Sequence, residues 1–345
     1  MVELLVLLAS LACNLLGLCS NDLADCKSDD LYEQIPACQR IIDDLSEAPK
    51  VRALAFNRRG EMYFALRNPT RAIEDFSSAI ELVPDFADAL INRGIAFHAS
   101  RAVDRAIDDY NEALRHHPKN AHAYGNRGFA YHDKKDHARA IDDFRQAIRL
   151  NPKHSSAYYN MGNTYVAMGD TDRALEAYAS SIQINPKNAP AFNNRGLTYS
   201  SLRDFERAVA DFSEAIRLDE RHAAAYFNRS RVYYATAEYD RAIDDCNNAI
   251  LIDNKYSAAF NMRGLARYAR GEHDSAIADF SEAIRLDPRD ALAYNNRGMA
   301  YVKKGEFKSA IADYDEATRL DPNDAAAHHD RANAYRAMGE SSPRR

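Results

Sequence analysis

Several features that mark other protein classes are missing from this 345-residue sequence. It contains no tryptophan, and its 45 Lys and Arg and 51 Asp and Glu are interspersed, which gives a net charge of −6. No basic block offers a surface to a phosphate backbone, so nucleic acid is not an expected partner. The longest apolar run, residues 4–18, is shorter than the roughly 20 apolar residues of a membrane-spanning helix.

Catalytic motifs are missing as well. The sequence has no glycine-rich phosphate loop, no nucleophile elbow and no zinc-protease helix. The histidines mostly lie near expected turns, where a solvated imidazole is the ordinary state, so we expect neither a metal site nor a cofactor. Acidic pairs recur at regular intervals, whereas a catalytic pair would occur once. We therefore expect no enzymatic activity, and we expect Cys246 to be a packing residue.

What the sequence does contain is a 34-residue repeat. Prolines recur at this spacing or its multiples, at Pro84, Pro118, Pro152, Pro186, Pro288 and Pro322. Such a period indicates a stack of supersecondary units that forms one continuous array. The array should span residues 53–339, with eight full repeats and a partial ninth at 53–86, 87–120, 121–154, 155–188, 189–222, 223–256, 257–290, 291–324 and 325–339, before a tail at 340–345.

Each repeat reads as two helices when its residues are numbered 1–34. Positions 4 and 11 are bulky and apolar, two helical turns apart, with a small residue at position 8 between them. Glycine at position 15 is placed to end this helix A, and proline at position 32 stops the following helix B. Position 20 is always alanine, and positions 24 and 28 are large. One such pair cannot bury both apolar faces, so neighbouring repeats must stack.

These residues resemble the tetratricopeptide repeat (TPR) family. Repeat eight matches the family pattern at Tyr294, Gly298, Tyr301, Ala310, Tyr314, Ala317 and Pro322. The resemblance implies an all-α, right-handed α-solenoid of eight helix pairs and a C-terminal capping helix, with its groove lined by the A helices. Three departures, Ser230, Cys246 and Arg267, predict that repeats six and seven are the least regular.

Two charged columns are not demanded by the family pattern. Position 7 is arginine in eight repeats and position 23 is aspartate in seven, but the fourth repeat has Met161 and Ala177 there instead. Because cation and anion are lost together, we predict a buried Arg–Asp pair within each repeat, for example Arg93–Asp109, Arg127–Asp143, Arg195–Asp211 and Arg297–Asp313. The alternative is an arginine row that faces a ligand.

Position 6 carries a row of asparagines, Asn92, Asn126, Asn160, Asn194, Asn228 and Asn296. The family resemblance puts this position in the groove, similar to superhelical TPR proteins that hold an extended peptide by its backbone. A carboxamide suits that role, because it offers both a donor and an acceptor. The alternative is that these side chains cap or bridge neighbouring helices. Other groove positions vary and are expected to set selectivity, among them Tyr159, Asn163, Phe129 and Arg231.

The N-terminal part indicates export. Residues 1–19 resemble a cleaved signal peptide, although Glu3 stands where a cation is usual; a retained anchor, a lipoprotein or a wrongly assigned start are the alternatives. Residues 20–52 should then cap the array, with Cys26 and Cys38 joined in a disulfide or else buried as free thiols. Ile35, Cys38, Ile42 and Leu45 lie on one helical stripe, which predicts a short covering helix.

Together these features predict a non-enzymatic scaffold that binds an extended segment of a protein partner in its groove. The chain resembles exported or periplasmic bacterial TPR proteins, so we expect a periplasmic location and no membrane span in the mature chain. Three alternatives stay open. They are an adaptor associated with the outer membrane, a regulatory subunit of a glycosyltransferase-like enzyme, and a cytoplasmic co-chaperone. Neither the partner nor the oligomeric state follows from the sequence.

Overall fold

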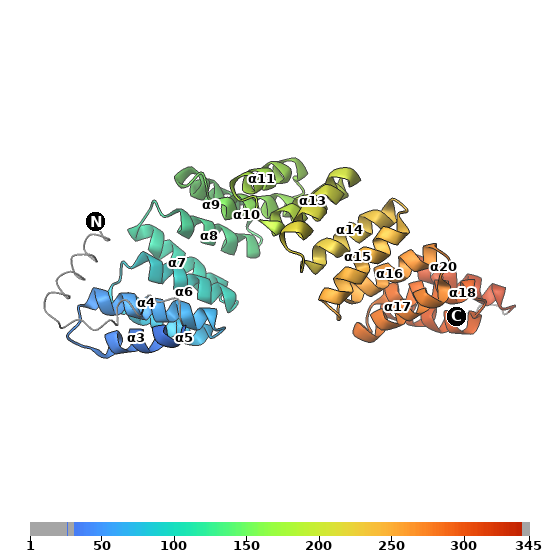
Figure 1. The fold of residues 1–345 in the computed structure, drawn as a ribbon, viewed down its shortest axis with the longest axis horizontal. Helices are drawn as coiled ribbons and strands as arrows, with labels where there is room; N and C mark the ends of the chain where they lie inside the picture. The colour runs from blue at the N-terminus through green and yellow to red at the C-terminus, as the bar shows by residue number, and fades with distance from the viewer. Residues whose placement is uncertain (1–25, 27–30, 340–345) are drawn as a thin grey trace. The chain divides into compact units, whose positions relative to one another are not determined.

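The computed structural model describes residue 26 and residues 31–339, and its ribbon is shown in Figure 1. Within these residues the chain forms 18 α-helices, α3–α20, and no strand, which confirms the predicted all-α solenoid of stacked helix pairs. The predicted signal peptide, residues 1–19, and the tail, residues 340–345, lie outside the described residues. No helix in the described ranges is long and apolar enough to cross a bilayer.

Each repeat is a helix A followed by an antiparallel helix B. The A helices are α4 (Pro49–Ala65), α6 (Ala87–Ala99), α8 (Ala121–Asp133), α10 (Ser155–Ala167), α12 (Ala189–Ser201), α14 (Ala223–Ala235), α16 (Ser257–Ala269), α18 (Ala291–Lys303) and α20 (Ala325–Ala337). The B helices are α5 (Pro69–Leu82), α7 (Val103–His116), α9 (His137–Leu150), α11 (Thr171–Ile184), α13 (Phe205–Leu218), α15 (Tyr239–Ile252), α17 (His273–Leu286) and α19 (Phe307–Leu320).

The turn between the two helices has the same backbone conformation in every repeat. Position 15 is left-handed throughout, with φ of 77–82° at Gly169, Gly271, Gly305 and Gly339. At the other five repeats a residue with a side chain adopts it, for example Lys135 at φ 63° and Ala237 at φ 61°. Amide groups after the turn bond back to the end of helix A, as Asp136 N does to Tyr131 O at 2.9 Å. Glycine is thus favoured at this turn but not required.

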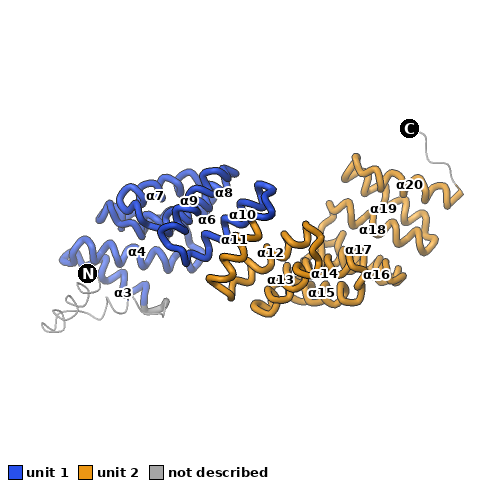
Figure 2. Tube along the Cα trace, turned by 90° about the horizontal axis from the view of Figure 1, so that it is seen from above, with its two compact units in different colours: residues 1–173 blue, residues 174–345 orange. Residues whose placement is uncertain are grey.

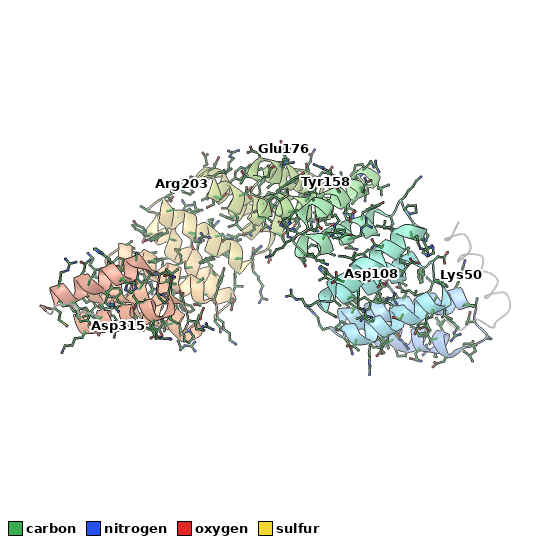
Figure 3. All side chains as sticks on the ribbon, turned by 180° about the vertical axis from the view of Figure 1, so that it is seen from behind. Lys50, Asp108, Tyr158, Glu176, Arg203 and Asp315 are labelled. Carbon is green, nitrogen blue, oxygen red and sulfur yellow. A yellow bond between two sulfur atoms is a disulfide. The ribbon has the colours of Figure 1, made fainter. Side chains whose placement is uncertain are left out.

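The core within a repeat depends on how closely the two helices approach. At position 8 of helix A, an added Cβ would lie 2.5–2.8 Å from the ring at position 24 of helix B, as at Gly94 opposite Tyr110 and Gly128 opposite Phe144. These rings and the alanine at position 20 are buried. Charged side chains that point away from this core, such as Asp108, Glu176 and Arg203, are exposed (Figure 3).

The chain divides into two compact units, which are coloured separately in Figure 2. Unit 1 ends at Arg173 and unit 2 begins at Ala174, at the start of α11. Within each unit the A helices of neighbouring repeats contact one another, as α6 contacts α8 and α14 contacts α16. No two B helices in the described residues make comparable contact, so the A helices form the inner layer of each unit.

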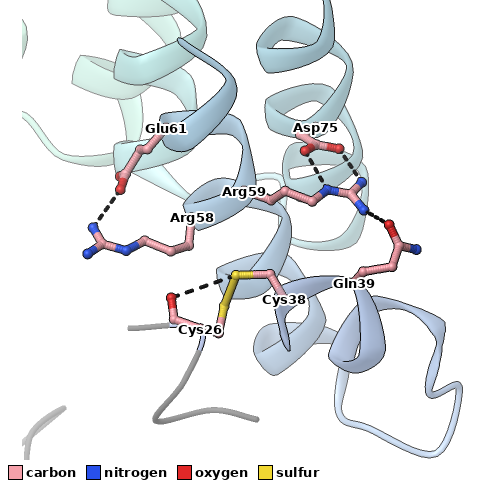
Figure 4. Close-up of a disulfide and its surroundings, with 7 residues drawn as sticks. All are labelled: Cys26, Cys38, Gln39, Arg58, Arg59, Glu61 and Asp75. Carbon is pink, nitrogen blue, oxygen red and sulfur yellow. Dashed lines mark hydrogen bonds and ion pairs between the residues drawn. A yellow bond between two sulfur atoms is a disulfide. The ribbon is translucent and has the colours of Figure 1, made fainter. Parts of the chain in front are cut away.

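Helix α3 (Leu31–Asp43) packs against α4 and covers the start of unit 1. Cys26 and Cys38 lie at bonding distance, with an Sγ–Sγ separation of 2.07 Å (Figure 4). They pack with Ile41 and Ile42 in a small apolar cluster. One expectation for this region is wrong. The sequence predicts Leu45 on the stripe of the covering helix, but α3 ends at Asp43 and the Leu45 side chain is 79% exposed. In addition, α4 starts at Pro49, so the predicted boundary at residues 52/53 falls inside a helix.

The prediction that repeats six and seven are irregular is also wrong. Their A and B helices have 13 and 14 residues, the same lengths as in the other repeats from α6 onward. In repeat six, the extra volume of Ser230 at position 8 is matched by a small Cys246 at position 24, where other repeats place a ring. In repeat seven, Arg267 replaces the tyrosine and donates to Asp279 at 2.8 Å. Each departure is therefore compensated locally.

Candidate functional site

The candidate site is the surface that the A helices form at positions 5, 6, 9 and 12, which we call the inner face. Side chains at these positions reach from one A helix to the next, and Asn92, Asn228 and Asn296 show this most directly. Because units 1 and 2 each have their own stretch of inner face, the two are described separately.

Three of the six predicted asparagines are engaged with the preceding repeat. Their Nδ2 groups donate to the asparagine 35 residues earlier, at position 5, with distances of 2.9–3.1 Å. The pairs are Asn92 with Asn57, Asn228 with Asn193, and Asn296 with Asn261. Asn92 also donates to Glu61 Oε1 at 3.0 Å. In these repeats the carboxamide bridges neighbouring A helices, which was the alternative to a role in peptide binding.

Asn126 and Asn160 differ from those three. Their preceding position-5 residues are Ile91 and Gly125, which have no side-chain acceptor. Both carboxamides are half-buried, and neither has a hydrogen-bond partner among the described residues. The Thr164 hydroxyl donates to Asn160, but to its backbone carbonyl and not to its carboxamide. The two residues lie on adjacent A helices of unit 1, α8 and α10, which contact each other. They are the members of the row whose amide groups remain available.

An asparagine at position 5 is therefore paired only when the residue 35 positions later is also asparagine, and the C-terminal end shows the case where it is not. Asn295, at position 5, is followed 35 residues later by Asp330, not by asparagine. A carboxylate has no N–H to donate, and Asn295 Oδ1 is buried without a partner within the described part of the chain. Burial raises the pKa of Asp330.

The remaining asparagine of the row, Asn194, accepts a bond at Oδ1 from Asn193 at 3.1 Å, so it too is engaged.

The residues expected to set selectivity lie near the free carboxamides only in unit 1. Phe129 is 38% exposed on α8 and meets the His98 ring edge-on at a centroid distance of 5.0 Å. His98 Nε2 in turn lies 2.8 Å from Asp133 Oδ2. Tyr159 and Asn163 are half-buried on α10. Arg231 belongs to unit 2, where it is exposed and lies 6.0 Å from the centroid of the Phe227 ring.

Histidines are concentrated on the same unit. His132 Nδ1 lies 2.9 Å from Thr164 Oγ1, and its ring lies 5.5 Å from that of His137. The rings of His122 and His154 are 4.9 Å apart. Burial, and to a smaller extent the neighbouring imidazole, lowers the pKa of both His132 and His154. These side chains are therefore held neutral at pH 7.

The predicted Arg–Asp columns meet within every repeat that carries both residues, away from the inner face. Arg93, Arg127, Arg195 and Arg297 donate through Nε and Nη2 to both oxygens of Asp109, Asp143, Asp211 and Asp313, respectively, at 2.7–2.9 Å. Arg59, Arg229 and Arg263 hold Asp75, Asp245 and Asp279 in the same way. The aspartates are buried. Hydrogen bonding to the carboxylate raises the pKa of Arg127 and Arg297.

Five of these arginines have a second partner that the sequence reasoning missed. Their Nη1 groups donate to position 25 of the preceding repeat, at Ser77, Asn111, Ser213, Asn247 and Ser281, whereas Arg195 has Ala179 at that place. For Arg59, the first in the column, Gln39 of α3 takes this place (Figure 4). Each of these five arginines thus joins its own helix B to the previous one. The signal was present as a serine or asparagine 16 positions before each of the five.

The chemistry of the site is that of a binding surface. Within the described residues no group of three or more His, Cys, Asp and Glu side chains is arranged to hold a metal ion. Burial raises the pKa of the Cys246 thiol to about 12, so its nucleophilic thiolate is not populated near neutral pH. An open pocket of about 810 Å³ lies elsewhere in unit 1, between the loops around Phe86 and Pro118 and the start of α4, and none of the six asparagines lines it.

Comparison with known proteins agrees with this architecture. Family models described as "TPR repeat" match residues 264–305 and 298–339, and models described as "Tetratricopeptide repeat" match residues 57–121, 120–187, 189–222 and 223–256. No curated protein matches the sequence.

Solved structures share the fold. The Cut9–Hcn1 complex of the APC/C is 17% identical over 88% of this chain, with a TM-score of 0.59, and this chain covers 59% of that protein's length. PilF of Pseudomonas aeruginosa is 16% identical over 62% of this chain and 97% of its own, with a TM-score of 0.55. A tetratricopeptide repeat protein from Parabacteroides merdae is 20% identical over 72% and 98%, with a TM-score of 0.54. With helix pairs, spacing and family models in agreement, this chain is a member of the tetratricopeptide repeat family.

Proposed function

We propose that this protein is a non-enzymatic adaptor that binds an extended segment of a partner protein along the inner face of unit 1. The TPR array supports the general role, since stacked helix pairs present a long surface for protein partners. The location on unit 1 is supported by one observation. Asn126 and Asn160 carry the carboxamides that no neighbouring side chain in the described residues uses.

The proposed mechanism is capture of the partner's backbone. A free carboxamide can accept from a peptide N–H and donate to a peptide C=O at the same time, without reading the side chains. Asn126 and Asn160 lie on adjacent helices, so they can bond to successive stretches of one extended chain. Each bond contributes about 1 kcal/mol. In unit 2 the corresponding amide of Asn228 already donates to Asn193, so backbone capture is weaker there.

Selectivity would come from the side chains beside these amides. The exposed ring of Phe129 offers an apolar platform, and the His98–Asp133 pair at its edge is polar. A segment with an apolar residue over Phe129, flanked by polar residues, fits this surface. Aromatic platforms of this kind contribute binding energy at a small entropic cost, because the ring is already held in place.

The test uses two matched double variants. Peptides that bind the wild-type chain are first selected from a displayed library of random sequences. Asn126→Ala with Asn160→Ala should weaken these peptides at least tenfold and leave the melting temperature unchanged. Asn228→Ala with Asn296→Ala removes two inter-repeat bridges, so it should lower the melting temperature and leave peptide affinity unchanged. If the first pair binds as wild type does, backbone capture by unit 1 is wrong.

We also propose that the protein is exported to the periplasm, with residues 1–19 removed. The approach of Cys26 to Cys38 supports this, since a stable disulfide requires an oxidising compartment. Mass spectrometry of the protein purified from its native source should show a new N-terminus near residue 20 and the loss of two hydrogens. An intact N-terminus with free thiols would instead support a cytoplasmic protein.

A further inference from the structure

The last arginine of the position-7 column is incompletely bound. The seven earlier arginines each grip an aspartate of their own helix B through Nε and Nη2. Arg331, on α20, is the eighth. Its Nη1 donates to Asp315 Oδ1 at 2.8 Å and to Thr318 Oγ1 at 3.3 Å, but its Nε and Nη2 have no partner among residues 31–339. The donor fork that elsewhere holds a carboxylate is open.

Asp315 shows that the other half of this arrangement is intact. It occupies position 25 of repeat eight, where earlier repeats have serine or asparagine, and it lies on α19 in the last full repeat (Figure 3). Arg331 is therefore held by the preceding helix B, as five earlier members of the column are. Only the side of the guanidinium that would face a following helix B lacks an acceptor.

The rest of α20 keeps the surface against which a helix B packs. Position 8 is the small residue Ala332 and position 11 is Tyr335, and both side chains are half-buried. Helix α20 contacts α19 and α18, and it forms the C-terminal edge of unit 2 in the described residues (Figure 2). No described helix packs on its other side.

The nearest match to α20 within the chain is α14, which shows what such a surface binds. Helix α14 has Arg229 at position 7, a non-glycine residue, Ser230, at position 8, and Tyr233 at position 11. Its partner α15 supplies a contact for each of these three residues. Asp245 takes the arginine fork at 2.8 Å, the small Cys246 faces Ser230, and the Arg241 guanidinium lies 3.9 Å from the centroid of the Tyr233 ring.

We propose that the side of α20 that no described helix covers binds an amphipathic helix of a different protein, with the pattern Arg-Ala-x-x-Asp followed by a small residue. The aspartate accepts both bonds from the open Arg331 fork, the arginine stacks on Tyr335, and the small residue fits against Ala332. The bound helix completes a ninth helix pair. Charge complementarity selects the partner, since a buried bidentate Arg–carboxylate pair discriminates strongly against a neutral side chain. This binding is independent of the inner face.

The pattern also excludes most helices of the TPR type. An aromatic residue after the aspartate packs against glycine at position 8, where an added Cβ would lie within 2.8 Å of the ring. Ala332 carries that Cβ. A helix with phenylalanine at this place should therefore fit poorly against α20, whereas one with alanine or cysteine should fit.

The test uses a peptide with the sequence of α15, residues 239–252, with alanine in place of Cys246. A side-chain cross-link between its exposed positions 244 and 248 holds it helical, because a free peptide of this length is only marginally helical. Titrated into the full-length chain by calorimetry, it should bind saturably. The peptide carrying Asp245→Asn should bind at least tenfold more weakly.

Protein variants assign the contact. Arg331→Lys keeps the bond to Asp315 but loses the fork, so it should weaken the aspartate peptide at least tenfold and abolish its advantage over the asparagine peptide. Arg336→Lys, on the same helix, should change nothing. A peptide with phenylalanine at position 246 should bind weakly to wild type and regain affinity for Ala332→Gly. The proposal is overturned if the aspartate and asparagine peptides bind equally well, or if no saturable binding occurs. It is also overturned if the affinity losses from Arg331→Lys in the protein and Asp245→Asn in the peptide are additive. A self-associated chain that Arg331→Lys dissociates would overturn it as well, because a second copy would then be the occupant.

Discussion

Arg127 and Asp143 form a two-point ion pair, with Nε–Oδ2 and Nη2–Oδ1 distances both of 2.7 Å, at the junction of α8 and α9. The Arg127 side chain is 20% exposed and that of Asp143 is 8% exposed. The same guanidinium donates to Asn111 of the preceding repeat at 2.7 Å. One side chain therefore fixes both the angle within a repeat and the contact between repeats.

The first prediction concerns this pair. Asp143→Asn should lower the free energy of unfolding by about 3 kcal/mol, because it leaves the Arg127 charge partly buried without a counter-ion. The double change Arg127→Met with Asp143→Ala reproduces the fourth repeat, Met161 and Ala177, and should cost under about 1 kcal/mol. Urea unfolding followed by circular dichroism measures both. A double variant as unstable as the single one would mean that the pair is not the relevant unit.

A second prediction concerns Ser230 and Cys246. The first is larger than the glycine usual at position 8, and the second is smaller than the aromatic ring usual at position 24. Cys246→Phe alone should overpack the repeat and cost roughly 1–3 kcal/mol, because in the repeats with glycine at position 8 an added Cβ would lie within 2.8 Å of the ring, and Ser230 carries that Cβ. Adding Ser230→Gly should recover most of this loss and restore the arrangement of Gly264 with Phe280. The coupling between the two changes, read from thermal unfolding of all four proteins, checks the idea. Additive effects would contradict it.

Third, unit 1 should lose stability in acid. Burial lowers the pKa of His132 and His154 in the folded state below about 6.5, the ordinary value in the unfolded chain. The unfolded state then binds more protons, so stability is retained above pH 6.5 and falls as the pH drops below it. Each group can contribute at most about 1.4 kcal/mol per pH unit. Melting temperatures between pH 8 and pH 5 report this slope.

The matched variants for the acid effect are all changes of histidine to asparagine. His132→Asn with His154→Asn should flatten the slope, since the depressed groups are gone. His329→Asn, which is exposed on α20, should leave it as in wild type. The rings of His137 and His122, which face those of His132 and His154, are kept in every variant. If the double variant keeps the full slope, other groups cause the acid sensitivity.

Fourth, the Cys26–Cys38 link should stabilise the cap locally. The two cysteines are 12 residues apart, and closing a loop of that size stabilises by roughly 3 kcal/mol. Cys38→Ser, or a reducing agent, should speed amide hydrogen exchange in α3 and the first turns of α4. Exchange in α18 and α19 should not change, because each repeat contacts only its neighbours. Identical exchange in α3 with and without the link would show that the cap does not depend on it.

Much of this fold could be predicted because a helical repeat is governed by local rules. The 34-residue period, the helix caps and the apolar stripe all act over distances within one repeat. The Arg–Asp columns are also readable, since the two residues are always 16 apart and disappear together at Met161 and Ala177. Ser230 and Cys246 are also 16 residues apart, but their residue types alone predict irregularity and not the compensation that the structure has.

The sequence by itself determined the helix pairs, their order and the charged columns, because the partners in each case lie within one repeat. Only the tertiary structure decided which asparagines are free. That depends on the residue that faces each carboxamide from the previous A helix: Asn57 engages Asn92, whereas Gly125 leaves Asn160 open. The open fork of Arg331 likewise became evident only once its neighbours were placed, since a side chain's hydrogen bonds are set by what packs against it and not by its own position in the chain.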